Sequence, residues 1–153
     1  MLRTLAFAKD INDLSFSKHH ELLLVSSDSL YLIQTRNAKH IKSFSVSEES
    51  FTSAVLSADS SKIFSSHLDG TIRVWSVESG KVQSTFPIGT PIKKLALSPD
   101  DSLLICLGYN ETELFGINSF SGKPAWEKES VETTFNDVRF SENGAFFLTG
   151  GND

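Results

Sequence analysis

Four segments of the chain share one pattern of apolar and polar positions, and each segment ends in a serine. The segments are INDLSFS (11–17), FTSAVLS (51–57), IKKLALS (92–98) and FNDVRFS (135–141). Their last residues, Ser17, Ser57, Ser98 and Ser141, follow one another at intervals of 40, 41 and 43 residues. A large apolar residue stands one and six positions before each serine. The alternation immediately before the serine has the period of a β-strand, so the pattern predicts a repeated unit that begins with a strand.

A turn and three further predicted strands follow each serine. The turns KHHE, ADSS, PDDS and ENGA draw on residues that supply turn dihedrals or cap their own backbone. The predicted second strands are 22–25, 62–64, 103–107 and 146–148, the third strands 29–35, 71–77 and 112–118, and the fourth strands 40–46, 81–86 and, more weakly, 123–129. The second strands are continuously apolar, which indicates sheets covered on both faces. Four short strands in ~40 residues form one blade of a β-propeller.

Short polar side chains recur in the turn between the second and third strands. Asp69, Asn110 and Asp153 stand twelve residues after three of the serines, and Asp28 stands eleven residues after the first. A short acceptor in this place closes a tight turn by accepting hydrogen bonds from backbone N–H groups.

The stretch LSADSSKIFSSHLDGTIRVWSVESGKVQSTF (56–86) closely resembles a WD40 repeat through its Ser-x-Asp, Leu-Asp-Gly-Thr and Ile-Arg-Val-Trp segments. LALSPDDSLL and VRFSENGAFFLTGGND in the third and fourth copies resemble it more loosely. The resemblance implies an all-β fold, a WD40-type β-propeller with three complete four-stranded blades plus a partial fourth. The whole chain, 1–153, is then a partial propeller whose ring is not closed within this chain. We expect the repeats at approximately 9–46, 49–86, 90–129 and 133–153 (truncated), with 2–8 as the outer strand of a missing closing blade.

The chain departs from the family pattern at two places. The WD dipeptide is Trp75-Ser76 here, and the Gly-His pair that usually precedes the first strand is missing. The resemblance implies that Asp69, Trp75 and either Ser65 or Ser66 keep part of the hydrogen-bonded set that stiffens a WD40 blade. Without the histidine, we expect Asp69 to rely on backbone donors. Asn110 and Asp153 are the corresponding turn residues of the later copies.

About seven blades of ~40 residues close a WD40 ring, and this chain has 153 residues. We therefore expect the sequence to be a fragment of a longer protein. The alternative is a half-propeller that closes by pairing with a second chain. In isolation, an open arc exposes apolar blade faces and strand edges, so we expect the isolated chain to self-associate.

Composition and motifs argue against most kinds of chemistry. The formal net charge of −5 disfavours direct binding of nucleic acid or an anionic membrane. The single cysteine, Cys106, cannot form an internal disulfide, and the four histidines lack metal-site spacing. The chain has no apolar run long enough for a membrane span or a signal peptide. We expect no catalytic residue, metal or cofactor, and an intracellular protein, cytoplasmic or nuclear.

The resemblance implies a non-catalytic scaffold for protein–protein interaction, as a WD40 subunit or adaptor of an intracellular multiprotein complex. Its partners are proteins or peptides that bind the propeller rim, for which His67, Thr90 and Tyr109 are the candidates. One alternative is a subunit of an RNA-processing or ribosome-assembly complex. Another is a propeller enzyme of the lactonase or hydrolase type. The channel-lining positions for such an enzyme are Asp13, Ser53, Lys94 and Asp137, at equivalent offsets before the four serines.

Overall fold

The computed structural model describes residues 4–46, 51–126, 129–130 and 134–152. The helices and strands of these residues are all β-strands. The strands form three four-stranded sheets and one two-stranded sheet. Neighbouring strands within each sheet are antiparallel. The described part of the chain has no helix that could cross a membrane. These sheets confirm the all-β fold with three four-stranded blades and a partial fourth.

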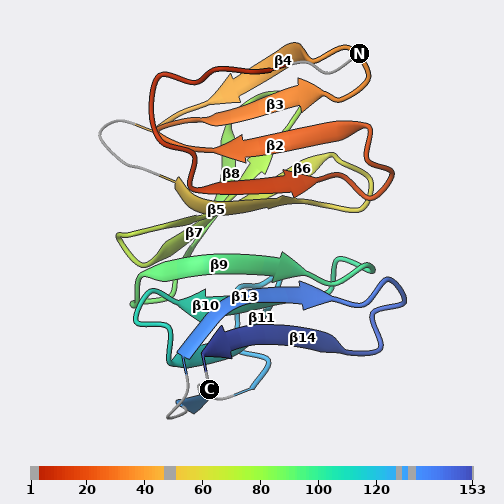
Figure 1. The fold of residues 1–153 in the computed structure, drawn as a ribbon. Helices are drawn as coiled ribbons and strands as arrows, with labels where there is room; N and C mark the ends of the chain where they lie inside the picture. The colour runs from red at the N-terminus through yellow and green to blue at the C-terminus, as the bar shows by residue number, and fades with distance from the viewer. Residues whose placement is uncertain (1–3, 47–50, 127–128, 131–133, 153) are drawn as a thin grey trace.

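The blades follow one another in chain order. The first blade consists of β1 (Asp13–Phe16), β2 (Leu22–Ser26), β3 (Leu30–Gln34) and β4 (Lys39–Phe44). The second consists of β5 (Phe51–Leu56), β6 (Lys62–His67), β7 (Thr71–Ser76) and β8 (Val82–Pro87). The third consists of β9 (Ile92–Leu97), β10 (Leu103–Gly108), β11 (Glu113–Asn118) and β12 (Glu129–Ser130). The partial fourth blade pairs β13 (Thr134–Phe140) with β14 (Phe147–Asn152). Figure 1 shows the blades succeeding one another from the N-terminal to the C-terminal end, with the ring open.

The repeated serine organises the turn between the first two strands of each blade. In the second blade, Ser57 Oγ accepts a hydrogen bond from the backbone N–H of Lys62 at 2.9 Å and donates one to Asp59 Oδ1 at 2.7 Å. The backbone N–H of Ser60 donates to the carbonyl of Ser57 at 2.8 Å, and Ser60 has a φ of 59°. The residues in this left-handed position of the four turns are His20, Ser60, Asp101 and Gly144. The serine hydroxyl therefore accepts a backbone hydrogen bond at the point where the chain reverses and the strand pairing ends.

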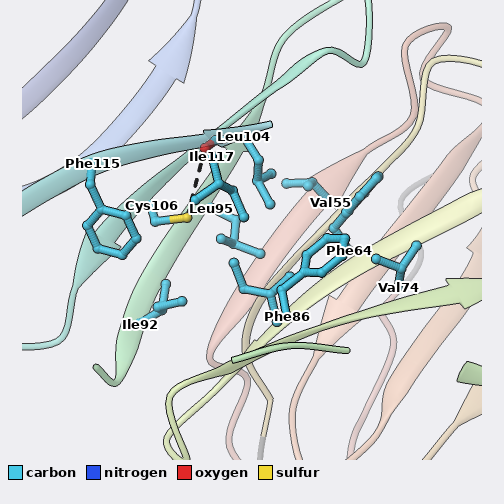
Figure 2. Packing of buried hydrophobic residues seen from close by; sticks show 11 residues of the cluster. Val55, Phe64, Val74, Phe86, Ile92, Leu95, Leu104, Cys106, Phe115 and Ile117 are labelled. Atoms are coloured by element: carbon cyan, nitrogen blue, oxygen red, sulfur yellow. Dashed lines mark hydrogen bonds between the residues drawn. The ribbon is translucent and has the colours of Figure 1, made fainter. Parts of the chain in front are cut away.

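Three apolar clusters lie between successive blades, and together they form the core. Figure 2 shows the cluster between the second and third blades, where Phe64 and Phe86 face Leu95, Leu104 and other buried residues. Leu32 and Phe44 of the first blade pack with Trp75 and other residues of the second blade. Val138 of the partial blade packs with Ala96, Ile105 and Leu107 of the third. Each complete blade therefore contributes its apolar residues to contacts with its neighbours, which explains the continuously apolar second strands.

The outer strand of the third blade differs from its prediction over 123–129. In the described residues of this segment, the structure has an isolated bridge between Ile117 and Pro124 and the start of a two-residue strand, β12. Proline has no N–H to donate to a ladder. The Trp126 ring stacks parallel to Phe147 of the partial blade, with 6.2 Å between ring centroids. A Cβ on Gly116 would lie 2.2 Å from the Trp126 ring, so this glycine makes room for the indole. The Trp126 side chain thus covers Gly116 and contacts the partial blade.

The described part of the N-terminal segment, residues 4–8, contains no strand. Phe7 packs against Tyr31 of β3, with ring centroids 5.2 Å apart. Residues 5–8, which are apolar, lie beside the face of the first blade that carries His40. The pairing of this segment with a closing blade stays a prediction, as do the repeat boundaries, and residues 2 and 3 lie outside the described part.

Candidate functional site

A buried hydrogen-bonded set joins β6 and β7 of the second blade. The indole N–H of Trp75 on β7 donates to Ser65 Oγ on β6 at 2.8 Å. The same hydroxyl lies 3.0 Å from Nε2 of His67, within hydrogen-bond distance. Ser65 and His67 are fully buried, and Trp75 is nearly so. Of the two serines left open by the sequence, the structure therefore puts Ser65 next to Trp75, while Ser66 Oγ donates to the carbonyl of Ser53.

Asp69 closes the tight turn between β6 and β7. Its carboxylate accepts hydrogen bonds from the backbone N–H of Thr71 at 2.8 Å, the Thr71 hydroxyl at 2.6 Å and the Arg73 guanidinium at 2.9 Å. Burial acts to raise the pKa of Asp69, but the Thr71 hydrogen bonds and the charges of Arg73 and His67 hold that pKa below its ordinary value. The expectation that Asp69 relies on backbone donors was therefore incomplete, because a hydroxyl and a guanidinium also donate to it.

His67 connects the turn to the buried set. Arg73 Nη1 lies 3.5 Å from His67 Nδ1, so a chain of contacts runs from Asp69 through Arg73 and His67 to Ser65. His67 thus supplies an imidazole to a blade that lacks the usual Gly-His pair. Sequence reasoning missed this role, although His67 follows Ser65 by two residues and therefore shares its face of the strand. The placement of His67 at the exposed rim was wrong, because the side chain is fully buried at the end of β6.

The other two rim candidates lie close together at one end of the third blade. Tyr109 follows β10, and its side chain is 55% exposed. Its backbone N–H donates to the carbonyl of Pro91, at 2.8 Å, in the loop that contains Thr90. Thr90 is half-buried, and its hydroxyl donates to Glu113 Oε2 at 3.2 Å. The structure therefore holds Thr90 and Tyr109 on connected loops, and their binding of a partner stays a prediction.

Asn110 stands in the exposed turn next to Tyr109. This turn is closed by a backbone hydrogen bond from Glu111 N–H to the carbonyl of Gly108, at 3.0 Å. Asn110 Oδ1 lies 2.9 Å from the place that a Cβ on Gly108 would take, which favours glycine there. Asp153, the corresponding residue of the fourth copy, lies outside the described residues.

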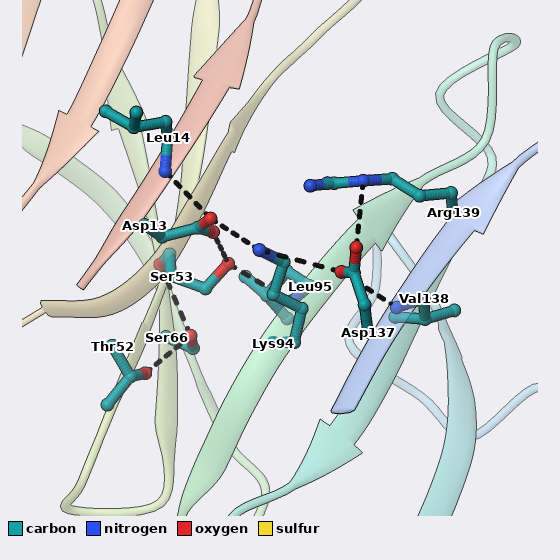
Figure 3. A network of polar contacts seen from close by, with 10 residues as sticks. All are labelled: Asp13, Leu14, Thr52, Ser53, Ser66, Lys94, Leu95, Asp137, Val138 and Arg139. Atoms are coloured by element: carbon teal, nitrogen blue, oxygen red, sulfur yellow. Dashed lines mark hydrogen bonds and ion pairs between the residues drawn. The ribbon is translucent and has the colours of Figure 1, made fainter. Parts of the chain in front are cut away.

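The innermost strands bring together the four channel-lining residues expected from their equivalent offsets (Figure 3). Ser53 Oγ on β5 donates to Asp13 Oδ2 on β1 at 2.5 Å, and Lys94 Nζ on β9 lies 2.5 Å from Asp13 Oδ1. Lys94 also lies 3.6 Å from Asp137 on β13, whose other oxygen faces Arg139 at 3.5 Å. One ionic network, the channel network, thus joins the inner strands of all four sheets.

Backbone groups complete the channel network. Leu14 N–H donates to Asp13 Oδ1 at 2.8 Å, and Val138 N–H donates to Asp137 Oδ1 at 3.0 Å. Leu95 N–H donates to Ser53 Oγ at 3.2 Å. Because every member of the network binds another member or its own strand, the arrangement suits cross-linking of blades.

The remaining candidates for chemistry are the cysteine and the metal-ligating side chains. Cys106 is fully buried, and burial raises the pKa of its thiol far above the ordinary value. In the part of the chain that the structure describes, no group of three or more His, Cys, Asp or Glu side chains is arranged to hold a metal ion.

The family model for the WD domain, G-beta repeat (WD40), matches residues 38–76. That match begins beside β4 of the first blade and ends with β7 of the second, so the matched unit spans parts of two sheets. It contains the Ser65–Trp75 pair and the Asp69 turn. Residues 38–76 thus match a WD40 repeat, and the all-β blades are consistent with a partial WD40 propeller.

Three curated proteins that this chain resembles are named as a complex subunit, a transcription factor and a translation initiation factor subunit. The Mus musculus target of rapamycin complex subunit LST8 is 29% identical over 86 residues, which cover 56% of this chain and 26% of that protein. Caenorhabditis elegans transcription factor unc-37 is 26% identical over 98 residues, or 64% of this chain and 16% of that protein. Eukaryotic translation initiation factor 3 subunit I of Aspergillus fumigatus is 18% identical over 163 aligned positions, or 95% of this chain and 48% of that protein. The chain thus spans about half or less of the length of these relatives.

Proposed function

We propose that this WD40 chain is a non-catalytic scaffold for protein–protein interaction, acting as a subunit or adaptor of an intracellular multiprotein complex. The observation that carries the proposal is the packing of the arc, in which apolar clusters and the channel network join each blade to the next. Loops on such a frame present their side chains with little ordering cost on binding. The names of the relatives, a complex subunit, a transcription factor and a translation initiation factor subunit, support a cytoplasmic or nuclear place.

The proposed contact surface is the rim formed by the loops of Thr90 and Tyr109. Tyrosine is enriched among residues that dominate interface energies, because its rigid ring carries both apolar area and a polar group. The backbone bond from Tyr109 to Pro91 fixes the tyrosine loop to the threonine loop. A protein or peptide that binds there meets a surface that is already ordered.

Affinity purification of the tagged chain and two variants tests the rim. Tyr109→Ala removes the exposed rim aromatic, and Phe120→Ala removes an aromatic that is 67% exposed beyond the opposite end of β11. We expect a defined set of proteins to co-purify with the wild-type and Phe120→Ala chains. The affinity for these proteins should fall at least about tenfold with Tyr109→Ala, which corresponds to a loss of about 1.4 kcal/mol in binding free energy. Equal recovery with Tyr109→Ala would contradict the proposed rim contact.

A place in an RNA-associated complex is an alternative within the same class of function. The relative aligned over 95% of this chain is a translation initiation factor subunit. The formal net charge of −5 favours contact with such a complex through protein. Tight binding of the isolated chain to RNA, with an affinity that falls steeply with added salt, would instead indicate direct contact.

Catalysis at the channel has little support from the geometry. Asp13 and Lys94 bind each other, and Ser53 donates to Asp13 and accepts from Leu95 N–H, so these groups are engaged in joining strands. A propeller hydrolase would need such groups directed at a substrate. The network therefore supports the non-catalytic proposal.

Self-association of the isolated chain is a further part of the proposal. Leu14 and Phe16 on β1 and Leu148 on β14 are exposed large apolar side chains, and β14 is an edge strand of a two-stranded sheet. Exposed apolar faces and open strand edges favour association. Sedimentation velocity should show a concentration-dependent rise in mass, reduced in Leu148→Lys. A single monomeric species at all concentrations would contradict this expectation.

A further inference from the structure

A turn joins β13 and β14 of the partial blade (Figure 1), and it contains an asparagine followed by a glycine. Of the asparagines in the chain, only Asn143 precedes a glycine, Gly144. The Asn143 side chain is exposed, and Gly144 has a φ of 71°. A Cβ on Gly144 would lie 3.1 Å from Pro99 Cδ, so the left-handed backbone and this neighbour both favour glycine. The backbone nitrogen that follows Asn143 therefore belongs to a residue with no side chain to hinder its approach.

Two donors hold the side-chain carbonyl of Asn143. Its Oδ1 accepts hydrogen bonds from the Ser141 hydroxyl at 2.9 Å and from the backbone N–H of Ala145 at 3.1 Å. Donors at a carbonyl oxygen stabilise the negative charge that this oxygen gains when a nucleophile adds to its carbon. The turn therefore makes Cγ of Asn143 a better electrophile.

The backbone nucleophile for this carbon is the nitrogen of Gly144, whose attack on Cγ closes a succinimide ring. The Gly144 N–H donates to the carbonyl of Ser141 at 2.9 Å. The nitrogen must lose this proton in order to attack. The reaction therefore requires the hydrogen bond to Ser141 to open, and it proceeds faster as the pH rises.

Aspartate stands at the equivalent place in the turns of the second and third blades. In both turns, a carboxylate oxygen accepts hydrogen bonds from the serine hydroxyl two residues before it and from the backbone N–H two residues after it, as Asn143 Oδ1 does. The hydroxyl bonds measure 2.7 Å at Asp59 and 2.6 Å at Asp100, and the backbone bonds measure 2.9 and 3.1 Å. Charge-assisted hydrogen bonds are stronger than neutral ones. The same donors in the partial blade therefore suit a carboxylate as well as an amide.

We propose that Asn143 is a site of spontaneous deamidation, and that its aspartate product keeps the turn geometry of the second and third blades. The Gly144 nitrogen bonds to Cγ of Asn143, the Cγ–Nδ2 bond breaks, and ammonia leaves with the proton that the nitrogen gave up. Water then adds to the succinimide. Ring opening at Cγ gives aspartate, and ring opening at the backbone carbonyl carbon gives isoaspartate, which lengthens the main chain. The site lies outside the proposed rim contact and does not rest on it.

Peptide mapping by mass spectrometry, after prolonged incubation of the full chain at mildly alkaline pH, tests the reaction. The signal is the mass gain from amide to acid, assigned to single residues by fragmentation. Asn118 is the matched control, because its Oδ1 also accepts hydrogen bonds from a serine hydroxyl and from backbone N–H groups. The nitrogen after Asn118 also donates to a carbonyl, but it belongs to the buried Ser119.

We expect the mass gain at Asn143 to be at least about tenfold faster than at Asn118, which corresponds to a barrier lower by about 1.4 kcal/mol. No gain at Asn143 would overturn the proposal, as would equal gains at the two residues. Isoaspartate is told from aspartate by the fragments that each backbone yields, so both predicted products can be identified.

Two variants test the fit of the aspartate product. Asn143→Asp carries the product from the start, whereas Asn143→Ala offers no acceptor to the Ser141 hydroxyl and the Ala145 N–H. In urea titrations at neutral pH, we expect the unfolding midpoint of Asn143→Asp to equal or exceed that of the wild type. The midpoint of Asn143→Ala should be lower than both. A midpoint of Asn143→Asp as low as that of Asn143→Ala would overturn the proposed product geometry, whatever the rim contributes to binding.

Discussion

Replacement of Lys94 by methionine tests how much the channel network contributes to the fold. The side chains of Lys94 and Asp13 are 16% and 4% exposed, and their charged atoms lie 2.5 Å apart. In Lys94→Met, the Asp13 carboxylate keeps its hydrogen bonds from Ser53 and Leu14 but loses the nearby cation. Removal of one partner of a buried ion pair costs about 3–5 kcal/mol, because the other charge stays buried without compensation. We expect a loss near the lower value, about 3 kcal/mol, since the two hydrogen bonds remain.

The preceding residue on the same strand gives a matched control. Lys93 pairs with Glu111, but the side chains of that pair are 30% and 36% exposed. Partly exposed pairs contribute about 0–1 kcal/mol, so Lys93→Met should lose no more than this. Urea unfolding followed by far-UV circular dichroism gives both free energies. In addition, Asp13→Asn should restore part of the stability of Lys94→Met, because the amide carries no charge. Equal losses for the two lysine variants would refute the reasoning.

Three further predictions concern single positions. Ser65→Ala should lower the free energy of unfolding by about 2 kcal/mol in urea titrations, because it leaves the buried Trp75 indole N–H without its acceptor. Gly122→Ala should lower the melting temperature more than Gly89→Ala: both have positive φ, but a Cβ on Gly122 would lie 2.4 Å from Phe86, while Gly89 has nothing within 4 Å. The pKa of Asp59 is lowered to about 2, chiefly by the hydroxyl of the serine two residues before it, so its stabilisation is present above the ordinary pKa of 3.8 and is lost as the pH falls toward 2. The stability difference between the wild type and Asp59→Ala, from urea titrations across this range, should therefore shrink as the pH falls.

The strand order and the turns could be predicted from the sequence because they rest on local signals. Alternation before each serine and turn residues after it place β5 and β6 on either side of the Ser57 turn. The same signals gave the channel-lining set, since one offset before each serine selects one strand position in every blade. The partners within that set depend on which blades are adjacent and how far Lys94 reaches, and neither follows from the offset.

Tertiary contacts explain what the sequence reasoning missed. His67 was expected in an exposed loop, but it is fully buried, and its ring lies 4.8 Å from that of Phe51 on β5. The outer strand of the third blade was predicted only weakly, over 123–129, and Trp126 packs across to Phe147 of the partial blade. In both cases one side chain meets a residue from another strand or blade, and no periodicity within a single segment signals that meeting.

The pairing of Ser65 with Trp75 explains why the second blade resembles the family pattern most closely. The residues at the same strand positions are Val25 with Ile33 in the first blade and Cys106 with Ile117 in the third. All four are buried, so these blades replace both partners of the hydrogen bond by weakly polar or apolar side chains. Replacement of both partners leaves no unsatisfied group and is nearly neutral for stability, whereas replacement of one partner is costly. The blade geometry can therefore persist where the polar signature is lost, and the family match at residues 38–76 covers the one pair that keeps it.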